Sequence, residues 1–256
     1  MAASYRSALV TGASSGIGVA FAKSLAARGC DLVLVARRAD RMQALARDLA
    51  GVAVEVLPAD LATDDGVRLV EERLADDPVE LLVNNAGVGI DGRFEAQSVD
   101  EATDVVRVNV IALLRLTHAA LGPMMRAGHG GILNVSSLAG DQPLRGFATY
   151  AASKSFVSTF TESLAAEARA AGVHVTLVKP GYVYTEMTEQ TAPDPKSLVG
   201  RFWLQPEDVA SAALDAVEHG RVTCVPGLPW RALSTVVQSI PHPVVRAVTS
   251  RFDASG

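Results

Sequence analysis

The stretch TGASSGIG, residues 11–18, places three glycines between an apolar run and a segment with helical spacing. Glycines in such a turn let backbone N–H groups approach a pyrophosphate, and the N-terminus of the following helix then faces the anion. The spacing here is G-x-x-x-G-x-G, whereas dinucleotide-binding proteins more commonly carry G-x-G-x-x-G. A glycine-rich connection that binds nothing is the competing interpretation, so the flanking sequence has to decide between the two.

Short runs rich in Val, Ile and Leu recur along the chain, with longer segments of helical spacing between them. The runs are residues 7–10, 31–36, 52–57, 80–83, 131–135, 173–178 and 222–225, and the clearest helical segments are 99–126 and 150–171. Nearly continuous apolar strands that alternate with helices predict a parallel sheet covered on both faces. No Pro/Gly/Ser-rich linker or internal repeat divides the sequence. We therefore predict one α/β domain over residues 1–256, a doubly wound parallel sheet (Rossmann fold) with helices on both faces.

The composition argues against several other classes of protein. The 256 residues carry a formal charge of −5, which disfavours a nucleic-acid partner. Cys30 and Cys224 show neither metal-ligand nor CxxC spacing, so we expect no metal, no disulfide scaffold and a reducing compartment. The longest apolar runs have five residues, whereas a membrane-spanning helix needs about 20. The N-terminus enters an apolar run too early for a signal peptide, and we expect a cytoplasmic protein.

The residues after the second apolar run indicate which dinucleotide is bound. Ala36 stands where an acid would hold the ribose 2′-hydroxyl of NAD, and Arg37 and Arg38 follow it. An isolated pair of arginines is usually a solvated surface feature. These two precede a predicted helix, in which Asp40 and Gln43 have the spacing of a capping box, and cations are unfavourable at a helix N-terminus. A bound anion would relieve that conflict, so we favour the 2′-phosphate of NADP(H).

A second constellation lies in YAASK, residues 150–154, where Tyr150 and Lys154 share one face at the start of a predicted helix. A phenol has a pKa of about 10, and a nearby ammonium lowers it, so such a pair can form a tuned acid or base. This spacing alone is common by chance. However, polar and glycine-rich motifs also occur at the ends of other predicted strands: NNAG (84–87), NVSSLAG (134–140) and KPGYVYTEM (179–187). VRVNV (106–110), with Asn109, is a further motif and lies in the predicted helical segment 99–126. Sites in α/β folds gather at the carboxyl ends of parallel strands, so these motifs predict one functional site.

TGASSGIG, NNAG, VNV, the serines before YAASK, and PGYVYT together resemble the classical short-chain dehydrogenase/reductase family, in order and at the expected spacing. The resemblance implies that Tyr150 protonates a substrate carbonyl as hydride arrives, or acts as the base in the reverse direction. Lys154 would lower the Tyr150 pKa and hydrogen-bond the nicotinamide ribose. Ser137, rather than Ser136, would hold the carbonyl. Asn109 would bind a water molecule that relays protons, although a capping or helix-kink role is its plainer interpretation.

The resemblance also implies a set of cofactor contacts. They are Gly12, Ser14, Ser15, Gly16, Ile17 and Gly18 around the pyrophosphate and adenosine ribose; Asp60 and Leu61 at the adenine; Asn85, Ala86 and Gly87 on the adenosine–ribose side; Val183 at the carboxamide; Thr185 at the carboxamide or phosphates; and Tyr150 and Lys154. Asp60 has the alternative interpretation of a helix cap. Ser15 is a departure, because some NADP-preferring members of the family carry a basic residue there. The NADP(H) expectation therefore rests on Arg37 and Arg38.

Residues 185–209 combine polar residues and prolines with an apolar group. That group is Leu198, Val199, Phe202, Trp203 and Leu204. We expect a mobile lid whose apolar inner side covers an apolar substrate and excludes water, the alternative being a surface excursion that binds nothing.

The segment 226–252 pairs an apolar face with basic residues. The apolar face comprises Leu233, Val236, Val237 and Ile240, and the basic residues are Arg231, His242, Arg246 and Arg251. Three interpretations compete for this segment: packing on its own domain or on a partner subunit, a roof over the substrate pocket, and contact with a membrane surface. The first is favoured because apolar helical stripes are usually core or interface.

The sequence therefore predicts an NADPH-dependent oxidoreductase that reduces a small-molecule ketone or aldehyde to an alcohol by hydride transfer. A non-catalytic NADP(H)-binding sensor on the same fold is the alternative from another class, and it would need the glycine turn but not the serine, tyrosine and lysine. A nucleotide-sugar epimerase or dehydratase is a rival among enzymes, although such relatives are usually longer. The natural carbonyl is not named by the sequence. By resemblance, the helices at 99–126 and 150–171 would pair copies of the chain into a homodimer or homotetramer.

Overall fold

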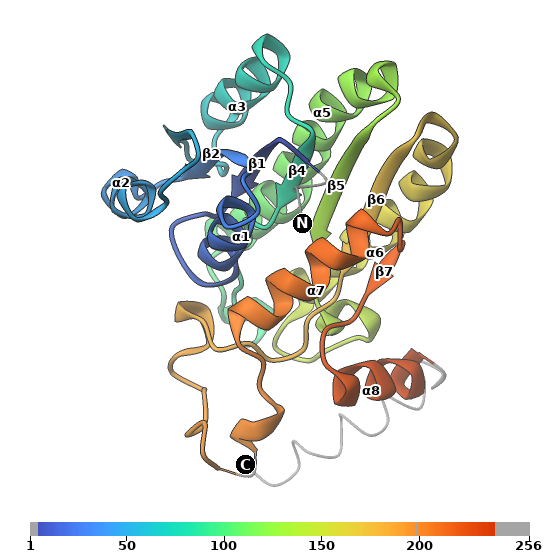
Figure 1. Cartoon of the computed structure of the whole chain (residues 1–256). Helices are drawn as coiled ribbons and strands as arrows, with labels where there is room; N and C mark the ends of the chain where they lie inside the picture. Colours follow the sequence, from blue (N-terminus) through green and yellow to red (C-terminus); the bar gives the residue numbers. More distant parts are fainter. Residues whose placement is uncertain (1–4, 198, 239–256) are drawn as a thin grey trace, which may run out of the picture.

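The computed structural model describes residues 5–197 and 199–238, and its centre is a parallel sheet (Figure 1). The seven strands lie in the order β3-β2-β1-β4-β5-β6-β7, and each neighbouring pair is parallel. The strands are β1 (Ser7–Thr11), β2 (Asp31–Ala36), β3 (Val54–Pro58), β4 (Leu81–Asn84), β5 (Gly130–Val135), β6 (Val173–Val178) and β7 (Thr223–Cys224). The chain builds one half of the sheet from β1 outward and then returns to place β4 on the other side of β1. The predicted doubly wound parallel sheet is confirmed.

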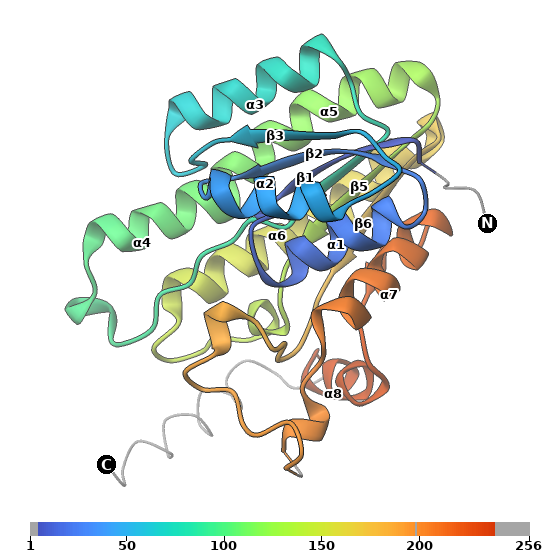
Figure 2. The same ribbon diagram turned by 60° about the vertical axis from the view of Figure 1, so that its left-hand side comes forward.

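Helices cover both faces of this sheet, as the turned view shows (Figure 2). In the described residues the α-helices are α1 (Gly16–Ala26), α2 (Ala39–Asp48), α3 (Asp64–Asp76), α4 (Val99–Val106), α5 (Leu113–Ala127), α6 (Ala148–Ala168), α7 (Pro206–Glu218) and α8 (Leu228–Gln238). Shorter turns are η1 (Phe94–Ala96), η2 (Arg107–Ala112), η3 (Leu138–Asp141), η4 (Arg169–Ala171), η5 (Glu186–Thr188) and η6 (Gly200–Phe202). Helices α1, α2 and α7 pack on one face, and α3, α5 and α6 on the other.

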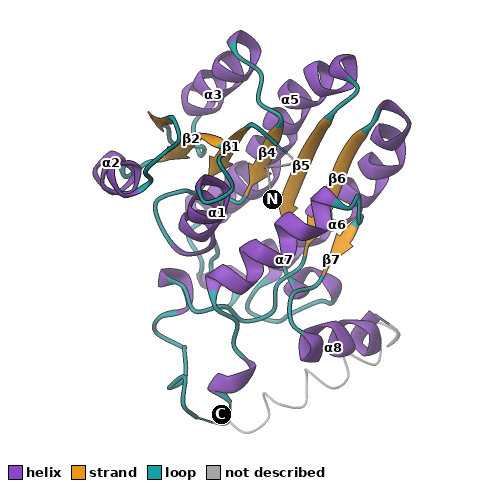
Figure 3. Ribbon diagram, in the orientation of Figure 1, coloured by secondary structure: helices purple, strands orange, loops and turns teal. Residues whose placement is uncertain are grey.

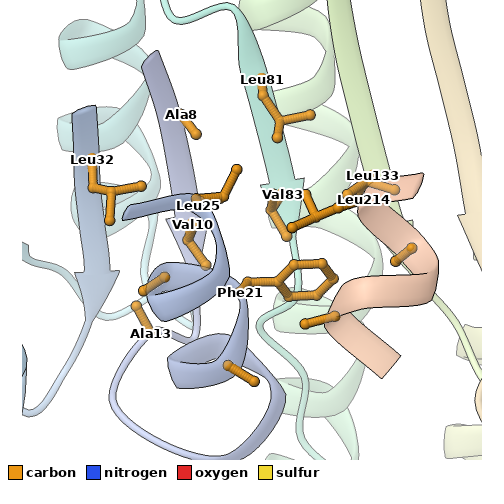
Figure 4. Close-up of a cluster of buried hydrophobic side chains, with 14 of the residues drawn as sticks. Ala8, Val10, Ala13, Phe21, Leu25, Leu32, Leu81, Val83, Leu133 and Leu214 are labelled. Carbon is orange, nitrogen blue, oxygen red and sulfur yellow. The ribbon is translucent and has the colours of Figure 1, made fainter. Parts of the chain in front are cut away.

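Each face of the sheet has its own apolar core, because successive strand residues point to opposite sides. On β1, Val10 belongs to the core under α1 and α7, whereas Leu9 belongs to the core under α3 and α5. Figure 4 shows Phe21 of α1 beside Val83 and Leu214, where strand and helix side chains meet. Phe21 and Leu214 are fully buried. These two cores fix the strands rigidly and thereby fix the loops that leave them.

The functional motifs lie where the strands end. Because all strands run in one direction, their carboxyl ends meet along one edge, and the loops that follow gather there (Figure 3). The chain reverses its direction of travel across the sheet between β1 and β4, which is where ligands bind in open α/β sheets. The glycine turn follows β1, and the NNAG loop follows β4, so the two meet at this point.

The predicted helix at 99–126 is one continuous helical rod with a defect near its middle. Between α4 and α5, the turn η2 (Arg107–Ala112) has π-helical hydrogen bonding. π-Turns inside α-helices are rare and occur often at functional sites. By length and composition this rod, Val99–Ala127, could cross a membrane. It packs instead on the sheet, with Leu116, Ala120 and Met124 in the apolar core, as a core helix does.

Candidate active site

The glycine turn after β1 is too tight for side chains. Gly12 and Gly16 have positive φ angles of 68° and 51°, a region that other residues rarely adopt. A Cβ atom on Gly18 would lie 2.1 Å from the carbonyl oxygen of Gly12, so only glycine fits beneath the turn. Ser15 is the N-cap of α1, and its side chain makes no capping hydrogen bond. The first N–H groups of α1 are therefore available to an anion, as the glycine spacing predicts.

The NNAG loop is tied to this turn through Thr11, the last residue of β1. The Thr11 hydroxyl accepts hydrogen bonds from the backbone N–H groups of Asn85 (3.0 Å) and Ala86 (2.9 Å). The Asn85 side chain donates to the carbonyl oxygen of Thr11 at 2.9 Å. Gly87 lies close to the predicted catalytic residues, because a Cβ atom there would lie 3.3 Å from Lys154 Nζ and 3.4 Å from Asn109 Oδ1. The structure thus brings the predicted cofactor loops and the predicted catalytic residues together.

A cavity of about 420 Å³ opens between the glycine turn and the segment after β6. Gly16 lines one side and Thr185, Glu186 and Glu189 line the other. A Cβ atom on Gly16 would lie 3.0 Å from the Thr185 side chain, so a larger residue at Gly16 would narrow the passage. Bare backbone at the turn, an uncapped helix N-terminus and this cavity together fit a dinucleotide with its pyrophosphate at α1.

The two arginines expected to meet a 2′-phosphate differ in their surroundings. Arg38 donates from Nε to the Ser14 hydroxyl at 3.2 Å, so it lies against the glycine turn. It also forms an ion pair of 2.8 Å with Glu186. Arg37 is exposed and makes no hydrogen bond or ion pair with the described residues. The structure therefore brings Arg38, but not Arg37, into contact with the cofactor loops.

Asp60 does not cap a helix, so that alternative is wrong. Thr63 is the N-cap of α3, and its hydroxyl accepts from the N–H of Gly66 at 3.1 Å. The Asp60 carboxylate instead accepts from the N–H of Ala62 at 3.0 Å and so closes the turn that leads into α3. Asp60 is half-buried and Leu61 is buried, and both lie directly after β3. Their contact with an adenine stays a prediction.

The predicted catalytic residues cluster around the start of α6. The Tyr150 and Ser137 side chains are hydrogen-bonded to each other. The Lys154 ammonium lies 5.8 Å from the centre of the Tyr150 ring and donates to the carbonyl oxygen of Val135 at 3.0 Å. Ser136 is turned inward: it is buried, and its hydroxyl donates to the carbonyl oxygen of Lys154 at 2.7 Å. The preference for Ser137 over Ser136 therefore agrees with the geometry.

Burial sets the proton affinities in this cluster. Burial raises the pKa of Tyr150, and the hydrogen bond with Ser137 only partly opposes the rise. The pKa of Lys154 falls to about 8, because burial disfavours its charged form. The net shift of the Tyr150 pKa is upward, and a lowering contribution from Lys154 stays a prediction. Removal of the phenol from water is the largest cause of that upward shift.

Asn109 lies in the π-turn η2 and is buried. Its side-chain amide exchanges two hydrogen bonds of 2.9 Å with the backbone of Val88 and donates to the Ser153 hydroxyl at 3.0 Å. The side chain thus fastens the loop after β4 to helix α6. A water relay through Asn109 stays a prediction.

A buried ion pair lies beside Ser137, and sequence reasoning missed it. Lys179 Nζ pairs with the Asp141 carboxylate, and both side chains are less than a tenth exposed. Asp141 ends the turn η3, which begins at the N-cap Ser137, and Lys179 directly follows β6. The pair therefore holds the Ser137 turn to the end of β6. Two charged residues that are separated by 38 positions give no local signal of their pairing.

The predicted lid is anchored by aromatic rings. A parallel bridge joins Val183 to Leu204, and Trp203 stacks on Tyr182 with ring centres 4.9 Å apart. Several apolar side chains nearby stay exposed: Tyr182, Met187, Val199 and Phe202. Leu198 lies outside the described residues. An apolar surface thus faces solvent at the side of the site where the predicted lid lies, while mobility of this segment stays a prediction.

Helix α8 is the described part of the predicted C-terminal segment. Of the predicted apolar face, Leu233 and Val236 are exposed in a single copy of the chain, whereas Ser234 is buried. Packing of this face on a partner subunit stays a prediction. The Ser234 hydroxyl lies 3.5 Å from Asp141, and Trp230 covers Gly181 so closely that a Cβ atom there would lie 2.2 Å from its ring. The described part of this segment therefore lies over the Ser137 turn, and residues 239–256 are outside the described residues.

Comparisons with known proteins agree with this geometry. The profile of the family described as short chain dehydrogenase matches residues 6–196. Nodulation protein G of Rhizobium sp. (strain N33) is 39% identical over 187 residues, 72% of this chain and 76% of that protein. The chain belongs to the short-chain dehydrogenase family.

Two solved structures are similar over nearly the whole chain. A short-chain dehydrogenase from Sphingobium yanoikuyae in complex with NADPH is 34% identical, with a TM-score of 0.80 over 92% of this chain and 96% of that one. The bulky-bulky ketone specific alcohol dehydrogenase from Comamonas testosteroni is 32% identical, with a TM-score of 0.79 over 92% of this chain and 95% of that one. The chain is thus an oxidoreductase of this family.

Proposed function

We propose that this protein is an NADPH-dependent reductase that converts a bulky apolar ketone or aldehyde to an alcohol. The observation that carries the proposal is the hydrogen-bonded pair of Tyr150 and Ser137 beside the buried Lys154, next to the cradle made by the glycine turn. This combination supports a role for Tyr150 as a proton donor beside the proposed dinucleotide site. A protein that only senses a dinucleotide has no need of that donor.

The proton affinities favour donation by Tyr150. NADPH, when bound, supplies the hydride that reduces the carbonyl carbon. Because burial raises the pKa of Tyr150, the phenol keeps its proton at neutral pH and donates it to the developing alkoxide oxygen. Ser137, hydrogen-bonded to Tyr150, holds the same oxygen. The ammonium of Lys154 then stabilises the phenolate, since an opposite charge nearby favours the ionised form.

The preference for NADPH over NADH rests on Arg38. It contacts the glycine turn through Ser14, and β2 ends in Ala36 where an acid would hold the ribose of NAD. The similar structure from Sphingobium yanoikuyae contains NADPH, which supports the same choice here.

The preference for a bulky apolar carbonyl rests on the segment after β6. Tyr182, Trp203 and Trp230 form a continuous aromatic cluster, in which Tyr182 and Trp230 lie 5.7 Å apart edge to face. Such rings offer large apolar contact area to a substrate. The similarity to a ketone dehydrogenase described as bulky-bulky specific supports this choice.

Oxidation of NADPH by wild-type protein against a panel of carbonyls tests the proposal. The panel runs from small aldehydes through long-chain 3-oxoacyl thioesters to steroid-like ketones. We expect kcat/KM to rise with apolar size, by about tenfold for each well-buried pair of methylene groups. Turnover confined to small polar carbonyls would contradict the substrate class. No turnover with tight NADPH binding would instead favour the sensor.

We also propose that a second copy of the chain covers the outer face formed by α4, η2, the start of α5, and α6. Several apolar side chains there stay exposed in one copy, namely Val106, Ile111, Leu114 and Phe156. They lie on elements that pack against one another or follow one another in one rod, so together they form an apolar face. A homodimer or homotetramer would bury it.

A further inference from the structure

Glu186 bridges two arginines at the mouth of the cofactor cavity. Its carboxylate pairs with Arg38 at 2.8 Å through one oxygen and with Arg41 through the other. Arg38 also donates to the Ser14 hydroxyl of the glycine turn at 3.2 Å. Glu186 itself lines the cavity of about 420 Å³. One carboxylate therefore connects the segment after β6 with the start of α2 and, through Arg38, with the glycine turn.

Arg38 and Arg41 lie at the start of α2, where an anion nearby would be stabilising. Arg38 is the N-cap of α2, and Arg41 follows in the first turn, where the helix dipole disfavours cations. Asp40 is the only acidic residue in that first turn. Hydrogen bonds from Arg38 and Arg41 hold the pKa of Glu186 below its ordinary value, so the carboxylate stays ionised. The sequence predicts that a bound phosphate provides a negative charge beside the start of α2. In the structure the Glu186 carboxylate provides that charge.

We propose that Arg38 and Arg41 form the 2′-phosphate site and that Glu186 occupies it until a 2′-phosphate displaces it. This inference rests on the proposed preference for NADPH. It adds Arg41 to the site and makes Glu186 a competitor that sets cofactor affinity. A guanidinium fork that binds a carboxylate also fits a phosphate, since both present paired oxygens to its N–H groups.

The competition has a modest size. All three side chains are between a third and a half exposed, and exposed ion pairs are weak and screened by salt. Because a phosphate must first displace Glu186, its affinity for the site is about three- to tenfold lower than it would be without that carboxylate. NADH and other ligands without a 2′-phosphate leave the two ion pairs intact and do not face this competition.

Calorimetric binding of 2′,5′-ADP and 5′-ADP to the full-length protein tests this inference. We expect Glu186→Gln to tighten 2′,5′-ADP by about three- to tenfold and to change 5′-ADP by less than about twofold. Glu189→Gln is the matched control, because Glu189 lines the same cavity three residues away and makes no ion pair with the described residues. The control removes the same charge and should leave both affinities within about twofold.

A second pair of variants tests the assignment of Arg41. Arg41→Ala should weaken 2′,5′-ADP by about tenfold, whereas Arg47→Ala, an exposed arginine in the last turn of the same helix, should not. Adding Glu186→Gln to Arg41→Ala should then tighten 2′,5′-ADP less than it does in the wild type, because one of the two ion pairs is already gone.

The outcomes separate this inference from the proposed function. Equal tightening by Glu186→Gln and Glu189→Gln would mean that only the general charge matters and would overturn the competition. An Arg41→Ala variant with wild-type affinity would overturn the assignment of the site. Both results leave the NADPH preference standing, provided that wild-type protein binds NADPH more tightly than NADH. If it does not, the proposed cofactor preference fails, and this inference fails with it.

Discussion

At the scale of single residues, burial controls the charge of the site more than neighbouring charges do. Lys154 is almost fully buried, and its Nζ donates a hydrogen bond to the carbonyl oxygen of Val135. A charged amine in such a place is destabilising, which is why its pKa falls to about 8. The position of Lys154 follows from the YAASK spacing, but its protonation depends on the packing around it, which the sequence does not display.

The depressed pKa of Lys154 predicts a pH-dependent stability. The unfolded chain keeps the lysine protonated up to about 10.5, whereas the folded chain releases the proton near 8. Between these values the unfolded state binds more protons, so the free energy of unfolding rises with pH, by about 3 kcal/mol at most. Urea unfolding between pH 7.5 and 10.5 should show this rise in the wild type relative to Lys154→Met.

The control for that experiment is Lys23→Met, which removes an exposed lysine of α1. Its unfolding free energy should follow the wild-type pH profile. Parallel profiles for wild type and Lys154→Met would show that the buried amine does not titrate in this range.

At the scale of elements, most strands and helices are predictable from hydrophobic period and glycine placement. The strands at 31–36 and 173–178 match the predicted runs residue for residue. The start of α2 is a miss: Arg38, not Asp40, is the N-cap, so Asp40 lies inside the first turn. The π-turn η2 was also missed, because Asn109 bonds to Val88, 21 residues away, and helical spacing does not report such a contact.

The outer faces of the helices carry a prediction about assembly. Leu114→Glu or Phe156→Glu places a charge on the apolar face that we propose a second copy covers. The wild type should have the mass of a dimer or tetramer by light scattering, and either variant should shift toward a monomer. Leu69→Glu is the control, since Leu69 is a comparably exposed apolar residue on α3. A monomeric wild type, or variants that assemble like the control, would refute the interface.

At the scale of the whole molecule, the site depends on contacts that join distant parts of the chain. Arg38 and Glu186 are 148 positions apart, and Asp141 meets Ser234 across 93 positions. The motifs of the strand ends predict the site because parallel strands bring their carboxyl ends to one edge. The sequence does not predict ion pairs such as Lys179 with Asp141, since only the folded sheet brings the end of β6 next to the turn η3.

The central claim is that Tyr150 donates the proton in a carbonyl reduction. The most direct measurement compares NADPH binding and turnover in wild type, Tyr150→Phe and the control Tyr5→Phe, which removes the hydroxyl of a buried residue two positions before β1. Fluorescence titration should give Tyr150→Phe an NADPH affinity within about twofold of wild type, while its turnover of the best ketone falls about 10²- to 10⁴-fold. Turnover of Tyr150→Phe at the wild-type rate would contradict the account.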